Sequence, residues 1–299
     1  MFVIPYLLKE GDFMFANIVV RDDFKDDIVD ISGRRFSDFG MMWGKLSNLT
    51  GIDLDTLSMY DDWYILNDEF YYFKEHCIFE ELFMSELAYE CKIKCVEFKL
   101  AFDKENLGVI SKLYRIKDKQ YYMYSDFCCK YFNHLPDNLN VFKLASSIAF
   151  GEENAQKLMN EIFSLMSFDM FSGQRDREEY NLFFECKNNN VRLASLCDNG
   201  AVFTESLVYS CPFGKFSLFD DYEYKVYRNN LLKIVSFNKI LFDKLAFLLD
   251  INIDEVLRRT IDKYRIIVDN ADKSYILGYF DNRKKAVELT LKLSKNNDR

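Results

Sequence analysis

The sequence has few of the features that separate domains or direct export. Its 299 residues include only three prolines and 11 glycines, and no stretch is rich in glycine, serine and proline. Any lobes must therefore be joined by a short, ordered hinge and not by a flexible linker. No run approaches the roughly 18 apolar residues of a membrane-spanning helix, and the N-terminus has no basic lead-in or small-residue cleavage site. We therefore expect a cytoplasmic protein without a membrane partner.

The chain also lacks the usual signals of nucleic-acid and zinc binding. The formal net charge is -9, whereas phosphate backbones bind clustered lysine and arginine, so direct nucleic-acid binding is not expected. Eight cysteines occur without a CxxC pair, and only two histidines could complete a zinc site near Cys91 and Cys95, which favours buried thiols. The acidic excess does not exclude a nucleotide, because magnesium can bridge phosphates to carboxylates.

The pattern of hydrophobic residues changes near residue 115. Upstream, residues 63–76 predict a β-hairpin with its turn at Asn67–Asp68, and residues 79–91 predict an amphipathic helix. Two strands follow, over 94–102 and 107–115. Downstream, helices are expected over 140–150, 154–171 and much of the last eighty residues, with a pair of strands over 180–189 and 191–200. A strand is also expected within 15–24 and a helix within 39–52. This order predicts an α+β protein, with a smaller mixed part followed by a larger helical part.

One constellation of polar residues has the types and spacing that phosphoryl transfer requires. Asp176 lies in a turn after a predicted helix, Asn181 follows five residues later, and Asp198 ends the second strand of the predicted pair. A hairpin between these strands would bring Asn181 and Asp198 to the same end. Carboxylate and amide oxygens suit Mg²⁺, and a further carboxylate can orient a hydroxyl. The sequence therefore predicts Asp176, Asn181 and Asp198 as catalytic residues, with Asn181 and Asp198 as metal ligands.

The same segments resemble the HipA-like serine/threonine kinases (the CtkA/HipA type), which are distantly similar to phosphatidylinositol kinases. Residues 173–181, GQRDREEYN, resemble the GN-x-DRH-x-x-N loop of that family, and 193–203, LASLCDNGAVF, resemble its LAPLYDNGxxL segment. Upstream, EFYYFKE resembles the strand with the ATP-binding lysine, and FEELFMSELAYECKI resembles the helix after it. LGVISKLY resembles the hinge strand, and DNRKKAVELTL resembles the C-terminal helix. These blocks occur in the family's order between about residues 60 and 290.

The resemblance implies a cofactor site as well. It assigns Lys74 to the ATP phosphates, Glu81 to the partner of that lysine, and Ser111 and Leu113 to the hinge. Helical periodicity favours Glu81 over Glu80 and Glu86, which are expected to be solvated. Asp169 matches a recurrent acid of the family or is a polar residue that ends a helix, and Arg177 is expected to tie the catalytic loop to a nearby carbonyl or carboxylate.

Three departures from the family pattern favour a second hypothesis. Gln174 and Glu178 replace an asparagine and a histidine, and the only candidate for a phosphate-binding loop is residues 31–40, ISGRRFSDFG. A kinase-shaped protein that binds nucleotide or a partner without phosphoryl transfer, a pseudokinase, is therefore the alternative. A kinase for a small molecule or a lipid headgroup is a third, and the acidic charge argues against membrane substrates.

The main hypothesis is a two-lobed protein-kinase-like fold, with an N-terminal lobe over 1–115 and a mainly helical C-terminal lobe over 116–299. ATP and Mg²⁺ are the expected cofactors, and the γ-phosphate would pass to a serine or threonine hydroxyl of a protein substrate. The resemblance implies autophosphorylation as one expectation, and a role as the toxin of a toxin–antitoxin pair, with a cognate antitoxin or regulator as partner, as another.

Overall fold

A computed structural model describes most of the chain outside the N-terminal region and residues 218–244. The described residues are 2–3, 19–20, 28–34, 63–66, 69–112, 120–136, 139–174, 177, 179–188, 190–203, 208–211, 214–217 and 245–297. The helix expected within 39–52 lies outside them, and so do Asp176, Glu178 and Leu113. Of the strand expected within 15–24, the described part is β2 (Val19–Val20), which is extended as predicted.

A five-stranded sheet, in the order β3-β6-β7-β5-β4, is formed by residues of the first 112. The hairpin of β4 (Trp63–Leu66) and β5 (Glu69–Lys74) is confirmed, with Leu66 opposite Glu69. The two strands expected next are confirmed as β6 (Phe98–Asp103) and β7 (Asn106–Lys112), an antiparallel pair. At the far edge, β3 (Val29–Asp30) pairs parallel to β6. The Lys74-bearing strand is thus an inner strand of the sheet.

Helix α3 (Ile78–Glu90) confirms the predicted helix but is buried on more sides than an amphipathic surface helix. One side packs against β6 and β7, and another packs against α9 (Ile253–Tyr264). Being covered by neighbours on two sides, α3 buries acids as well as apolar residues. Glu80 and Glu86 are only 2% and 6% exposed, so the prediction that they are solvated is wrong.

The second part of the chain is mainly helical, as predicted. Its helices here are α4 (Tyr124–Phe132), α5 (Leu139–Phe150) and α6 (Glu152–Ser172). The predicted strand pair is confirmed as an antiparallel hairpin of β9 (Phe183–Lys187) and β10 (Asn190–Leu193). Sequence analysis missed β8 (Gln120–Met123), which pairs with β9, and the small hairpin of β11 (Val208–Cys211) and β12 (Gly214–Ser217). Unlike the aromatic-rich runs around Asn67–Asp68, these short segments show no clear alternation of apolar and polar residues.

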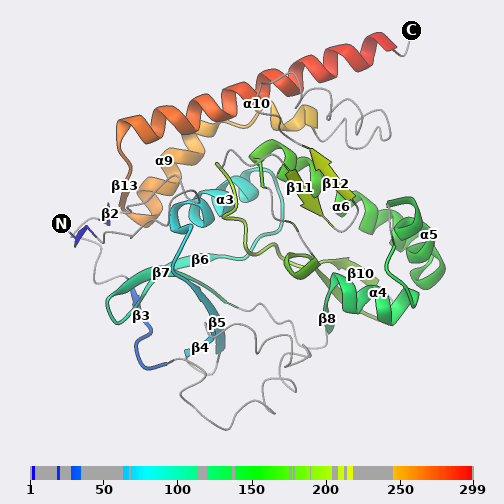
Figure 1. The fold of residues 1–299 in the computed structure, drawn as a ribbon, viewed down its shortest axis with the longest axis horizontal. Coiled ribbons are helices and arrows are strands. Elements are labelled where there is room, and N and C mark those ends of the chain that lie inside the picture. The colour runs from blue at the N-terminus through cyan, green and yellow to red at the C-terminus, as the bar shows by residue number, and fades with distance from the viewer. Residues whose placement is uncertain are drawn as a thin grey trace.

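The C-terminal residues form a helical unit that lies along α3. This C-terminal unit comprises α9, the short strand β13 (Ile266–Ile267) and the long helix α10 (Asn270–Asn297). Figure 1 shows α10 running along one side of the molecule, with α9 between it and α3 at one end. Strand β13 pairs with β2, which also pairs with β1 (Phe2–Val3), so two strands from the start of the chain join the strand between α9 and α10 in one small sheet.

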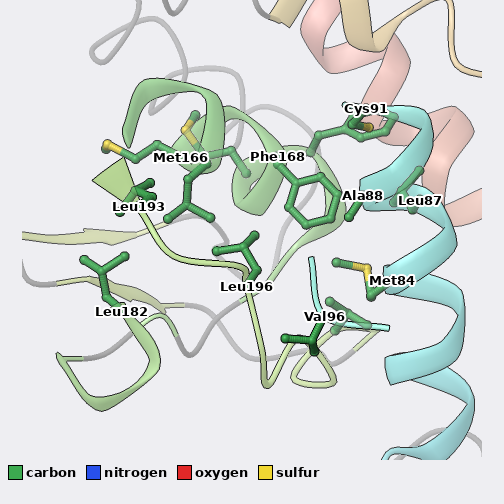
Figure 2. Close-up of a cluster of buried hydrophobic side chains, with 14 of the residues drawn as sticks. Met84, Leu87, Ala88, Cys91, Val96, Met166, Phe168, Leu182, Leu193 and Leu196 are labelled. Atoms are coloured by element: carbon green, nitrogen blue, oxygen red, sulfur yellow. The ribbon is translucent and has the colours of Figure 1, made fainter. Parts of the chain in front are cut away.

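The main core joins α3 to the helical part of the chain. Figure 2 shows Met84, Leu87 and Ala88 of α3 close to Phe168 of α6, with Leu196 beside them. All of these side chains are buried in one continuous cluster. Because interiors are close-packed, a shift of α3 would open voids along this contact. Within the described residues, no helix is long and apolar enough to cross a membrane.

Candidate active site

Lys74 joins two carboxylates from distant parts of the chain. It is the last residue of β5 and is 8% exposed. Its Nζ donates to Oε1 of Glu81 at 2.7 Å and to Oδ1 of Asp198 at 2.5 Å. Strand β5, helix α3 and the segment after β10 therefore converge on one ammonium group. Lys74, Glu81 and Asp198, each predicted to belong to the site, lie together.

Glu81 is the acid of α3 that faces this lysine. Its carboxylate is fully buried and also accepts hydrogen bonds from the backbone amides of Asn199, at 2.9 Å, and Gly200, at 3.0 Å. A buried carboxylate is costly without such donors. Gly200 has no room for a side chain, because a Cβ there would lie 2.6 Å from Cβ of Cys77 and 3.0 Å from Oε1 of Glu81. The Asp198–Gly200 segment is therefore held closely against the first turns of α3.

The Lys74 ammonium attracts both carboxylates, whereas Glu81 and Asp198 repel each other. Burial would lower the pKa of Lys74, but the adjacent Glu81 and Asp198 carboxylates outweigh it and hold that pKa well above its usual value. Burial would raise the pKa of Asp198, but the Lys74 ammonium outweighs this and lowers it. For Glu81, full burial dominates and raises the pKa. Asp198 is therefore the ionised partner of Lys74, with its side chain 40% exposed.

Glu80, the residue before Glu81 in α3, is also a buried carboxyl group. Burial raises the pKa of Glu80 to about 8, and the attraction of the Lys74 ammonium is too weak to reverse this effect. A carboxyl group with such a pKa is mostly protonated at neutral pH. The Lys74 ammonium and the amides of Asn199 and Gly200 bond instead to Glu81.

Arg177 ties the segment between α6 and β9 to its surroundings, as predicted. Its guanidinium makes a bidentate ion pair with Asp169 of α6, at 3.1 and 3.0 Å, and both side chains are almost completely buried. It also donates to the side-chain oxygen of Asn199 at 2.7 Å and to the carbonyl oxygens of Cys197, at 3.2 Å, and Asn181, at 3.5 Å. One guanidinium therefore links α6, the residues just before β9 and the residues just after β10.

These contacts bring the two predicted metal ligands to the same end of the β9–β10 hairpin. Asn181 ends a short 3-10 helix, Glu179–Asn181, directly before β9, and is 7% exposed. Asp198 follows β10 and has φ 51°, a left-handed conformation that Asp tolerates better than most residues. Asp176 lies outside the described residues, so its role stays a prediction.

Gln174 and Asn199 support Asp198 and were not predicted as site residues. Gln174 is fully buried and donates from Nε2 to the backbone carbonyl of Asp198 at 2.9 Å. Asn199 is fully buried and connects Arg177 to Glu81 through its side chain and its amide. A clue was available for Gln174, since it replaces the asparagine of the family loop. For Asn199, the Asp-Asn-Gly sequence suggested only a turn.

The residues present fit a magnesium ion. Within the described part of the chain, no group of three or more His, Cys, Asp or Glu side chains could hold a metal by itself. Asn181 and Asp198 would supply two oxygen ligands, and Mg²⁺ commonly takes one or two protein ligands and completes its shell with water and substrate phosphates. The donor chemistry thus suits a metal that arrives with a nucleotide better than a closed structural site.

The proposed phosphate loop does not lie beside Lys74 in its described part. Residues 31–34 follow edge strand β3, and two strands, β6 and β7, separate β3 from β5. Three strand spacings correspond to about 14 Å. Ser32 instead accepts a hydrogen bond from the amide of Lys104, in the β6–β7 turn, at 2.7 Å. Residues 31–34 therefore lie apart from Lys74, and residues 35–40 lie outside the described residues, so the assignment of this segment as a phosphate loop stays a prediction.

The hinge assignment remains a prediction. Ser111 is buried near the end of β7, opposite Tyr72 of β5 and Phe98 of β6. Leu113, the second residue assigned to the hinge, lies just beyond β7, outside the described residues.

Comparisons with known proteins reveal relatives only at the level of structure. No protein-family model matches the chain, and no curated protein does. The crystal structure of the Helicobacter pylori proinflammatory kinase CtkA matches with a TM-score of 0.54 and 16% identity, over 78% of this chain and 94% of that chain. The Shewanella oneidensis MR-1 toxin–antitoxin complex of HipA, HipB and operator DNA matches with a TM-score of 0.53 and 12% identity, over 76% of this chain and 62% of that chain.

These matches establish the fold. The chain has the mixed α/β, kinase-like fold of CtkA and HipA, as the sequence resemblance predicted. It spans about three fifths of the HipA-complex chain that it matches. At these identities the comparison concerns architecture, so the chemistry must be argued from the residues of the site.

Proposed function

We propose that this chain, which has the fold of HipA-like kinases, is an ATP- and Mg²⁺-dependent kinase that transfers the γ-phosphate to a serine or threonine hydroxyl of a protein. The observation that carries this proposal is the contact of Lys74 with both Glu81 and Asp198. Kinases orient the phosphates of ATP with a lysine that pairs with a glutamate on a helix and with a nearby aspartate that binds Mg²⁺. Asp198 reaches this lysine from 124 positions further along the chain.

Each residue has a definite role in the proposed reaction. Lys74, kept charged by its raised pKa, would contact the ATP phosphates, and Glu81 would hold its ammonium in place. Asp198 and Asn181 would hold Mg²⁺, which supplies charge neutralisation on the phosphates. Asp176 would accept or orient the proton of the acceptor hydroxyl. These groups act by position and charge, since phosphoryl transfer needs no covalent nucleophile from the protein.

The proposal includes a two-lobed organisation. Residues 1–115, with the five-stranded sheet and α3, would form the N-terminal lobe, and residues 116–299 the C-terminal lobe. ATP would lie between them, near Lys74, Ser111 and Leu113. The Lys74–Asp198 ion pair, with an Oδ1 to Nζ distance of 2.5 Å, would then connect the two lobes when no nucleotide is bound.

The experiment that tests the proposal is transfer of labelled γ-phosphate from ATP, with and without magnesium. The wild-type chain is compared with Asp176→Ala and Asp198→Ala, and with Asp254→Ala as control, since Asp254 is an exposed acid on α9. We expect label on the chain itself or on added proteins for the wild type and the control, and none for the other two variants. Transfer that persists in Asp198→Ala would refute the assigned site.

A pseudokinase is the alternative, and one observation favours it. Asp198, the proposed metal ligand, already has Oδ1 bonded to Lys74, so a metal must compete with an ammonium group for that oxygen. Under this alternative, ATP binding would be measurable by calorimetry and would be lost in Asp198→Ala, while no phosphate transfer would occur in any variant.

We extend the proposal to a toxin with an antitoxin or other regulatory protein as partner. The support is the structural match to a toxin–antitoxin complex of HipA and HipB. If the extension is correct, induced expression of the wild-type chain in bacteria should arrest growth, whereas Asp198→Ala at equal abundance should not. Equal growth arrest by both would refute a kinase toxin.

A further inference from the structure

Helix α9 binds the back of α3 through a buried carboxylate. Glu86, whose side chain is 8% exposed, accepts hydrogen bonds from Nε of Arg259 at 2.9 Å and from Nζ of Lys263 at 2.7 Å. Arg259 also reaches the Glu86 carbonyl oxygen at 3.3 Å and the Glu90 carboxylate at 3.1 Å. Two cations of one helix therefore converge on one acid of its neighbour.

This contact makes the position of α3 depend on α9. A buried carboxylate that loses its cations leaves an uncompensated charge, so α3 with Glu86 buried is stable only when α9 is docked. Glu86 is five residues from Glu81, or about 7.5 Å along the same helix axis. Helix α3 is short, and a rotation or slide at Glu86 would displace Glu81 from Lys74 and from the amides of Asn199 and Gly200.

Helix α10 contacts the other half of the site. Tyr279 donates from its hydroxyl to the carbonyl oxygen of Ser172 at 3.2 Å, and Arg283 donates from Nη1 to that of Met170 at 2.9 Å. Both acceptors belong to the last turn of α6, which leads into the catalytic segment. Gly173, with φ 78°, has Tyr279 and Arg283 where a Cβ would be. The residues that lead from α6 towards Arg177 are thus in close contact with α10.

An aromatic side chain of α10 connects the two halves. The ring of Phe280 lies 5.8 Å from Phe83 of α3, 5.3 Å from Phe171 of α6 and 6.0 Å from Phe203, three residues after Gly200. Phe83 and Phe203 are themselves 5.7 Å apart. Centroid distances of this size are typical of favourable aromatic pairs.

We propose that the C-terminal unit of α9, β13 and α10 is a built-in positioning element for the site, and that Arg259 is a positioning residue for Glu81. Arg259 acts through Glu86 and α3 and touches no substrate. The expected effect of Arg259 on the reaction rests on the proposed function, whereas its expected effect on the position of α3 does not. The position of Glu81 beside Lys74 is therefore fixed by a contact within the same chain.

The first experiment needs no nucleotide. Amide exchange is measured by NMR with isotope labelling of asparagine and glycine, which reports on the amides of Asn199 and Gly200 that donate to Glu81. In Arg259→Gln we expect these two amides to exchange faster by about tenfold or more, because local opening no longer costs the Arg259–Glu86 contact. Amides of the β9–β10 hairpin should keep their protection.

Arg258 offers a matched control on the same helix. Its guanidinium is 60% exposed and pairs with Glu255 and Asp262 of α9. Arg258→Gln therefore removes the same charge without loosening α3, and the two amides should exchange as in the wild type. Arg259→Lys should restore part of the protection. Should Arg259→Gln fail to fold, Arg259→Lys and Lys263→Gln are compared instead, and unchanged exchange in both would overturn the proposal.

The second experiment measures the effect on the reaction. If the chain is a kinase, Arg259→Gln should lower kcat and weaken ATP binding, leave the KM for the protein substrate unchanged, and be partly rescued by Arg259→Lys. If the wild type neither binds ATP nor transfers phosphate, the proposed function fails while the exchange result still decides this inference. If exchange at Asn199 and Gly200 is unchanged in Arg259→Gln, the inference fails whether or not the enzyme is active.

Discussion

The buried ion pair between Arg177 and Asp169 gives the sharpest prediction of stability. Arg177 is 1% exposed and Asp169 is fully buried, and two hydrogen bonds join them. Replacing Arg177 by Met keeps much of the side-chain volume but leaves the Asp169 carboxylate buried without its cation. Breaking a buried pair by removing one partner costs about 3–5 kcal/mol, so we expect Arg177→Met to lower the free energy of unfolding by that amount.

The assay is equilibrium unfolding in urea, with Arg192→Met as control. Arg192 pairs with Glu161 at 3.4 Å, but its side chain is 64% exposed. Exposed pairs contribute about 0–1 kcal/mol, so the control should change the free energy of unfolding by less than about 1 kcal/mol. Because Arg177 also holds Asn199, Cys197 and Asn181, its loss should abolish magnesium-dependent ATP binding even where the variant is still folded.

A double-mutant cycle tests the reasoning behind the prediction. Asp169→Leu alone should also be strongly destabilising, because it leaves the guanidinium without its carboxylate. Combined with Arg177→Met, the loss should be smaller than the sum of the single losses by about 1–3 kcal/mol. If the two losses simply add, or if Arg177→Met costs no more than Arg192→Met, the ion pair is not what holds this segment together.

Three further predictions concern α3 and the groups around it. Glu80 has its pKa raised to about 8 in the folded state, so the folded state holds a proton that the unfolded state releases above its ordinary pKa of 4.5, and stability falls as the pH rises from about 4.5 to 8. The midpoint temperature of thermal unfolding should therefore be the same for Glu80→Gln and the wild type near pH 4.5, and should be increasingly higher for the variant towards pH 8. A difference in midpoint that does not change with pH would contradict this assignment of the Glu80 pKa. Gly200→Ala should cost about 1–3 kcal/mol and impair ATP binding through its clash with Cys77, whose own φ is 54°, and Cys77→Gly should restore part of the binding. Lys74→Met leaves the Glu81 and Asp198 carboxylates facing each other without the ammonium group, so we expect the free energy of unfolding in urea to fall by about 3–5 kcal/mol. Calorimetry should detect no ATP binding by this variant, and normal binding would rule out the role of Lys74 in contacting the ATP phosphates.

Local patterns predicted most of the elements correctly. The alternation around Asn67–Asp68 indicated β4 and β5, and the apolar spacing of residues 79–87 indicated α3. Failures came where the decisive contacts are distant in sequence. Strand β8 is short and forms because β9 is beside it, and Glu80 and Glu86 are buried because the sheet and α9 cover α3 from two sides.

The sequence by itself determined the types of chemical group and their order along the chain. Asn181 and Asp198 could be named because oxygen donors flank a predicted hairpin. Lys74 and Glu81 could be named because their strand and helix resemble those of HipA-like kinases. Tertiary structure decided which acid meets the lysine, since Glu80, Glu81 and Glu86 share one short helix and differ in what packs on each side. It also decided that Arg177, Asn199 and the C-terminal unit hold the site together. The contacts of Arg177 with Cys197 and Asn199 span 20 and 22 positions, and that of Arg259 with Glu86 spans 173. No local pattern specifies such pairings, because they arise only when the whole chain is packed.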